Sequence, residues 1–224
     1  MKLKKAKLIE LVRPSLSTLG YTEFKLKEAQ GFFIKKLEDD LYLSLGLTIH
    51  RFYDSMFTGT YYLSPTTRWG ATWNDIPNKS YERPGKFLTK EERRLYLDNE
   101  HNKEGIIDVW WNGYSDEGIE NFIKVIEITE SRFIHQPELI SEIKNSSSIQ
   151  ELVKLSNETQ NIVLKNEIDN NVNFQPLKEI DGVPFVWYRA AETILKKQET
   201  TIPLNRNTVI ALASDAWRQN ILSI

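Results

Sequence analysis

The residue types that most often carry catalysis are few in this chain. There are three histidines, His50, His101 and His135, and there is no cysteine. No histidine has a second histidine at the spacing of metal ligands on a helix. Thiolate nucleophiles, disulfides and cysteine-bound metals are excluded by composition. The sequence therefore predicts no metal site and no cofactor.

Carboxylates could act as general acid and base, but the sequence does not bring any pair together. The candidate pairs are Asp108 with Asp116 and Glu100 with Glu104. Acid–base catalysis requires both groups within reach of one substrate. The glycine-rich phosphate loops, the zinc-protease motif and the nucleophile elbow are also missing from the sequence. No catalytic residue is assigned.

Tryptophan and arginine form the most unusual cluster. Arg68, Trp69 and Trp73 lie close together, and Trp110 and Trp111 are adjacent. Adjacent residues on a strand point to opposite faces, so one of the last two should line a groove or lie beneath a loop. The binding candidates are Arg68, Trp69, Trp73 and Trp111, because Trp and Arg dominate binding hot spots. The competing interpretation is that the loop tryptophans are structural pegs.

The elements that would position this cluster begin with a long strand. From Leu41 to Ile49 every odd position is Leu or Ile, which predicts a strand with one face in the core. The other face should meet solvent or a groove. Residues 56–63 are rich in Phe and Tyr and are expected to form the antiparallel partner of this strand. Residues 64–88 lose periodicity and are predicted to be a long loop, of the length that usually serves function.

Helices are expected before and after these strands in the sequence. Pro14 should bend the first helix or restart it at Ser15, and Gly20 should end it. Thr89 with Glu92 forms a capping box, Asp116 is the expected cap of the next helix, and a second box should begin at Ser148. The expected helices span residues 4–19, 89–100, 116–132, 137–143, 148–164, 184–197 and 207–222, and the expected short strands span 24–27, 32–35 and 106–111. Residues 166–182 are expected to form a linker or loop.

Strands gather before residue 112 and helices after it. This separation predicts an α+β fold with an antiparallel sheet of about four to five strands. We expect an α+β domain over residues 1–134 and a helical region over residues 137–224, which either stands alone or packs on the first.

Composition places the chain among ordinary folded proteins. It has 224 residues, of which 40% are hydrophobic, 27% charged and 11% aromatic, which excludes disordered and collagen-like classes. No apolar run is long enough for a signal peptide or a membrane span, so we expect a cytoplasmic protein. Residues 1–36 carry nine Lys and Arg against three Glu, whereas residues 89–151 carry seven against fourteen Asp and Glu. The acidic segment could steer a basic partner.

One stretch of the chain resembles a known kind of domain. The run Leu16-Ser17-Thr18-Leu19-Gly20-Tyr21 is followed by Gly31-Phe32-Phe33 and then by the long strand from Leu41. Over residues 5–130 this order resembles a family of small bacterial domains of unknown function found among the immunity proteins of polymorphic-toxin systems. The resemblance implies an amphipathic helix leading into antiparallel strands. It implies no catalytic residues.

Three functions follow from these observations. The first is a non-catalytic interaction protein, in particular an immunity-type protein that neutralises a bacterial toxin. Its partner would be another protein, not a membrane or a nucleic acid. The second is a small-molecule or carbohydrate binder that uses the tryptophan-lined loop. The third is an enzyme of unrecognised type, with Arg68, His50 and Asp108 as its best candidates.

Overall fold

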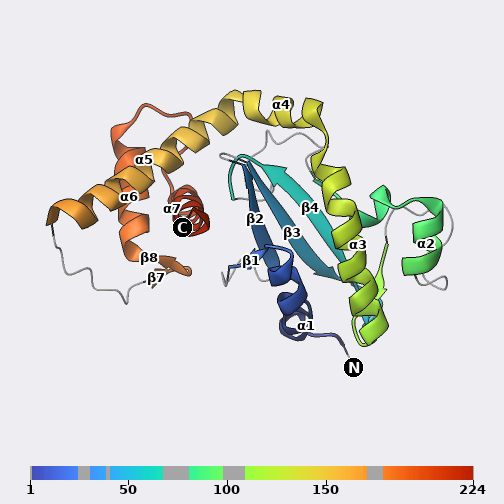
Figure 1. Cartoon of the computed structure of the whole chain (residues 1–224). Helices are drawn as coiled ribbons and strands as arrows, with labels where there is room; N and C mark the ends of the chain where they lie inside the picture. Colours follow the sequence, from blue (N-terminus) through green and yellow to red (C-terminus); the bar gives the residue numbers. More distant parts are fainter. Residues whose placement is uncertain are drawn as a thin grey trace.

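The computed structural model describes residues 2–24, 31–38, 41–67, 81–97, 109–170 and 179–223. The fold is α+β, as predicted, with an antiparallel sheet in the first half of the chain and helices after it (Figure 1). Within the described residues, no helix is long and apolar enough to cross a membrane.

The sheet has six strands in the described part of the chain, one more than the upper expectation. They are β1 (Thr22–Glu23), β2 (Phe32–Glu38), β3 (Leu41–Ile49), β4 (Met56–Ser64), β5 (Tyr81–Glu82) and β6 (Trp111–Asn112). Strands β1 to β5 lie side by side in the sheet in the order in which they occur in the chain. Strand β6 pairs with the beginning of β4. Strands β3 and β4 form the central hairpin, in which Leu45 lies opposite Tyr61.

The alternating pattern of β3 buries the odd-numbered side chains of one face in the core, as predicted. Leu43, Leu45 and Leu47 are buried in the main core. The even positions were expected to meet solvent or a groove, yet Tyr42 and Ser44 are also buried. Tyr42 belongs to a second cluster with Phe24 and Ile34, against which side chains of the last helix pack. The sequence of β3 alone could not show that the last helix covers this face of the strand.

Helix α1 (Lys5–Thr18) covers the face of the sheet that contains Leu43, Leu45 and Leu47, and it buries Leu8, Val12 and Leu16 there. Contrary to the expected restart at Ser15, the helix continues through Pro14. Burial of the apolar stripe on both sides of Pro14 holds the helix together despite the missing hydrogen bond. Gly20 ends it at a φ of 87°, and the Tyr21 N–H donates to the Leu16 carbonyl.

Helix α3 (Asp116–Ile134) lies beside α1 on the same face (Figure 1). Its cap is Ser115 rather than the expected Asp116, because the Ser115 side chain accepts from the Gly118 N–H. The ring of Phe122 packs 4.9 Å from that of Phe57. This contact fixes α3 over the β4 end of the sheet.

The predicted loop at 64–88 is only partly irregular. It contains β5 and a 3-10 helix, η3 (Pro84–Phe87). Thr89 and Glu92 form the expected capping box of α2 (Lys90–Tyr96). The expected strand at 106–111 is represented in the described residues by β6, and positions 25–27 of the expected first strand lie outside them.

The C-terminal half is helical. It contains α4 (Pro137–Asn145), α5 (Ser147–Asn170), α6 (Phe185–Lys197) and α7 (Arg206–Leu222), with a small hairpin of β7 (Glu179–Ile180) and β8 (Val183–Pro184) before α6. Helix α5 begins at Ser147, one residue before the expected start at Ser148, and it runs into the expected linker at 166–182.

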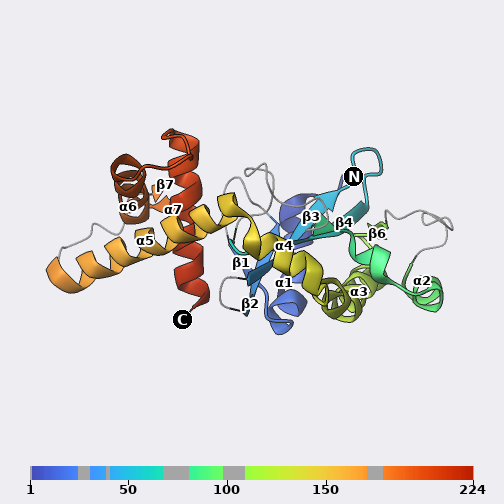
Figure 2. The same ribbon diagram turned by 90° about the horizontal axis from the view of Figure 1, so that it is seen from above.

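Helix α7 connects the two halves. The sequence predicts that it docks by one face, but its buried residues lie all round it. Figure 2 shows the reason: α7 runs between the α5 and α6 helices and the sheet. Besides the small cluster around Tyr42, the described residues form two larger cores. Side chains of α4 and Ile149 of α5 belong to the core of the sheet, whereas Leu155 and Val163 belong to the core of the last helices.

Candidate functional site

Three of the four predicted binding residues, Arg68, Trp69 and Trp73, lie outside the described residues. The fourth, Trp111, is 2% exposed in the main core. Its ring lies 5.1 Å from that of Phe122, and its indole N–H donates to the Tyr96 carbonyl at 3.2 Å. Those contacts hold α2 and α3 against β6.

Trp111 borders a mainly polar hollow of about 460 Å³ between α2 and the beginning of α3. The other lining residues are Arg94, Leu95, Tyr96, Leu97, Asn112, Ser115, Glu117, Gly118 and Asn121. Because Trp111 is almost completely buried, its indole offers little surface to a ligand there.

Trp110 precedes β6 and contacts other side chains than Trp111 does. Its ring is 4.4 Å from that of His50, edge to face, and the Arg83 guanidinium lies 5.5 Å from its centre. Arg83 also donates to the Gly59 carbonyl at 3.4 Å. Arg83 therefore connects β5 and the edge of β4 to Trp110.

His50 fixes the turn between β3 and β4. Its Nδ1 accepts from the backbone N–H groups of Phe52, at 3.0 Å, and Tyr53, at 3.1 Å. An accepting Nδ1 carries no proton, so the neutral ring holds its proton on Nε2. The His50 N–H donates to the Met56 carbonyl and closes the hairpin. These bonds give His50 a structural role that its isolated position in the sequence does not reveal.

The turn presents two large aromatic side chains to solvent. Phe52 is 78% exposed and Tyr53 is 57% exposed. The Arg51 guanidinium lies 5.5 Å from the centre of the Phe52 ring. We call His50, Arg51, Phe52, Tyr53 and Trp110 the hairpin surface. Such an arrangement of aromatic rings with arginine matches the composition of binding hot spots.

Two other segments border the hairpin surface. The Leu3 N–H donates to the Asp54 carbonyl at 2.7 Å, and the Gly113 N–H donates to the Ser55 carbonyl at 2.8 Å. Figure 2 shows the N-terminus beside the loop that joins β3 and β4. Leu3 is buried, so it anchors the exposed Lys2 and Lys4 next to the hairpin. Tyr114, which follows Gly113, is 48% exposed.

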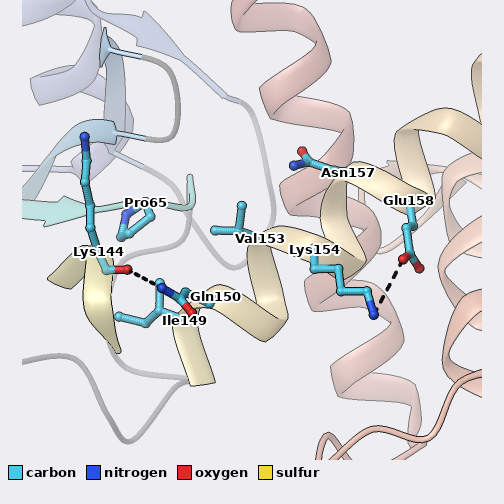
Figure 3. A pocket seen from close by; sticks show the side chains of 8 residues that line it. All are labelled: Pro65, Lys144, Ile149, Gln150, Val153, Lys154, Asn157 and Glu158. Atoms are coloured by element: carbon cyan, nitrogen blue, oxygen red, sulfur yellow. Dashed lines mark hydrogen bonds and ion pairs between the residues drawn. The ribbon is translucent and has the colours of Figure 1, made fainter. Parts of the chain in front are cut away.

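A second hollow, of about 550 Å³, lies between the end of β4 and α5. It is lined by Pro65, Lys144, Ile149, Gln150, Val153, Lys154, Asn157 and Glu158. Figure 3 shows Val153 pointing toward Pro65, with the Lys154–Glu158 pair at the rim. The Gln150 side chain donates to the Lys144 carbonyl at 3.0 Å. The walls are mainly apolar, and the lining includes a single carboxylate.

A buried polar network joins α7 to Thr67, in the segment that follows β4. Asp215 is 3% exposed, and its Oδ1 accepts from the Thr67 N–H at 2.7 Å and the Thr67 hydroxyl at 2.6 Å. Its Oδ2 accepts from the Gln219 amide at 2.9 Å. The Thr67 hydroxyl in turn accepts from the Arg218 Nε. No sequence pattern indicates this network, because Thr67 and Asp215 lie 148 positions apart.

Of the remaining candidates for chemistry, the structure describes Asp116 and His135, which lie at opposite ends of α3. Asp116 is exposed in the first turn of α3, and His135 is exposed at its end. His101, Glu100, Glu104 and Asp108 lie outside the described residues. Among the residues the structure describes, no group of three or more His, Cys, Asp and Glu side chains is placed to hold a metal ion.

Comparisons of the chain with protein-family models, with curated proteins and with solved structures find no match.

Proposed function

We propose that this is a non-catalytic protein that binds another protein through the hairpin surface, and that it belongs to the immunity type, neutralising a bacterial toxin. The observation that supports binding is the exposure of Phe52 and Tyr53 on a turn held by His50. The immunity type rests on the sequence resemblance.

The fixed turn matters because ordering a binding loop costs free energy during association. Two hydrogen bonds to His50 and the contact of its ring with Trp110 already hold the loop. A partner therefore meets the aromatic rings in a preformed arrangement. Burying an aromatic side chain of this kind contributes about 2 kcal/mol or more at a hot spot.

The use of the buried polar groups also supports a non-catalytic role. Asp215 and Thr67 bind each other across the two halves of the protein. The Tyr61 hydroxyl lies 3.2 Å from the Ile126 carbonyl and 3.1 Å from the Thr129 hydroxyl. Burial raises the pKa of Tyr61 well above its usual range, which keeps the phenol neutral. Such groups hold α3 and α7 in place.

The test is a set of truncations at the hairpin surface. The tagged protein is isolated from its own cells, the protein that copurifies is identified by mass spectrometry, and its affinity is measured by calorimetry. Phe52→Ala and Tyr53→Ala should each weaken binding by about 30-fold, the equivalent of about 2 kcal/mol. Leu204→Ala, which removes a 51% exposed side chain elsewhere, is the matched control.

Unchanged affinity in both aromatic variants would refute binding through this surface. For the immunity type, the identified partner is produced in cells with and without this protein. A partner that inhibits growth only when this protein is absent supports the proposal. A partner with no effect on growth in either case contradicts the immunity type and leaves the binding role to be judged by the affinities.

The hollow beside α5 favours a second candidate, a small-molecule binder. Its volume of about 550 Å³ lies within the range of ligand sites, and its walls combine apolar and polar groups. Val153→Trp would fill the space that Val153 and Pro65 border (Figure 3). A small molecule that raises the melting temperature of the wild type and not of Val153→Trp would support this function. Equal shifts in both proteins would exclude the hollow as its site.

A further inference from the structure

We propose that the hairpin surface and the lysines beside it bind an acidic segment of the protein partner, a segment that also carries apolar side chains. The inference rests on the binding role proposed above. The binding role does not say which side chains of the partner are recognised, and this inference identifies them as acidic and apolar.

Three exposed cations lie at or beside the exposed rings. The exposed Lys2 and Lys4 flank Leu3, whose N–H is bound to the Asp54 carbonyl in the same turn. Arg51 adds a third exposed cation, above Phe52. The first turn of α1 contains no acidic residue, so the positive end of the helix dipole adds to the same field. Carboxylates of a partner would meet complementary charge here.

The bordering groups favour a protein over a nucleic acid. Asp54 lies in the turn itself, and the exposed Asp116 and Glu117 begin α3, three or four positions after Gly113. A continuous phosphate backbone crossing the surface would meet these carboxylates. A polypeptide can place its own carboxylates opposite Lys2, Lys4 and Arg51 and its apolar side chains opposite the two rings.

Acidic side chains of the described helices α2 and α3 are partly paired with cations. On α3, Glu127 is paired with Lys124, and Glu130 is paired with Lys35 of β2. Glu92 of α2 is paired with Arg132. These pairs partly neutralise the acidic segment that the sequence suggested as a surface for a basic partner. The hairpin surface, with Lys2 and Lys4 beside it, combines exposed rings with cations from two segments.

The experiment uses a displayed library of short random peptides, selected against the full-length protein. The charge variant is Lys2→Gln, Lys4→Gln and Arg51→Gln together, and a second version uses Glu at the three positions. The matched control is Lys165→Gln, Lys196→Gln and Lys197→Gln, which removes the same charge from exposed positions on α5 and α6. Circular dichroism shows whether each variant is folded.

We expect the selected peptides to be enriched in Asp and Glu and to carry at least one large apolar residue. The charge variant should bind them at least about tenfold more weakly, the control should bind them as the wild type does, and added salt should weaken binding. Single-stranded oligothymidylate and vesicles containing phosphatidylserine are measured in parallel.

Three results would overturn the inference: no selected peptide, peptides without excess acidic residues, or tighter binding of oligothymidylate or vesicles than of the best peptide. The partner isolated from cells separates this failure from failure of the proposed function. If its affinity falls in Phe52→Ala and stays unchanged in the charge variant, the acidic segment is wrong and the binding role stands. If neither variant changes it, the hairpin surface is not the binding site.

Discussion

Replacing Asp215 with alanine should destabilise the protein strongly, because this carboxylate connects α7 to the segment that follows β4. It accepts two hydrogen bonds from Thr67 and one from Gln219, and both partners are at most 3% exposed. Alanine leaves these donors buried without their acceptor, and each such donor costs about 1–3 kcal/mol. Allowing for non-additivity, we expect a loss of about 3–5 kcal/mol in the free energy of unfolding.

Asp215→Asn removes the negative charge but keeps a hydrogen-bond acceptor, so it distinguishes the contributions of the two. The amide keeps one oxygen for Thr67 but turns an NH₂ group toward Gln219, so we expect a smaller loss of about 1–2 kcal/mol. Glu120→Ala, an exposed change on α3, should alter stability by less than about 0.5 kcal/mol. Urea unfolding followed by circular dichroism measures all three. A loss below about 1 kcal/mol in Asp215→Ala would refute the view that this network holds the two halves together.

Two further changes test the sheet and a surface pair. Leu45 is fully buried between β2 and β4, so Leu45→Ala should cost about 2–5 kcal/mol in urea unfolding, and an unmoved midpoint would contradict the assignment of its face. The hydrogen bonds from Arg132 and from the Thr89 backbone lower the pKa of Glu92 to about 2. Because the folded pKa lies below the unfolded value of about 4.3, the stabilisation is complete above that value and is lost as the pH falls toward 2. Stability should therefore fall less between pH 5 and pH 2 in Arg132→Gln, and parallel pH profiles for the two proteins would contradict the pairing.

Local patterns predicted the elements that depend on neighbouring residues. The alternation of β3, the glycine end of α1 at Gly20 and the Thr89 capping box all follow from contacts within a few positions. The misplaced boundaries have local causes too. Ser115 and Asp116 are both good caps, and only the backbone geometry decides between them.

The binding candidates were harder to predict than the elements. Tryptophan content marked Trp111 as a candidate, yet the described structure uses it to pack β6 against α3. Phe52 and Tyr53 lie between the two strands predicted at 41–49 and 56–63, where no periodic pattern marks a residue. A turn residue's exposure depends on which other segments cover it, and those segments come from elsewhere in the chain.

The sequence by itself determined the α+β class, the central hairpin and the face of β3 that enters the main core, because periodicity and caps act over a few residues. The tertiary structure alone decided what covers the other face, where α7 lies and which polar groups meet at Asp215. It also placed Lys2 and Lys4 beside Arg51 and the exposed rings. Those contacts join residues tens to more than a hundred positions apart, and their free energy exists only after the chain has brought the segments together.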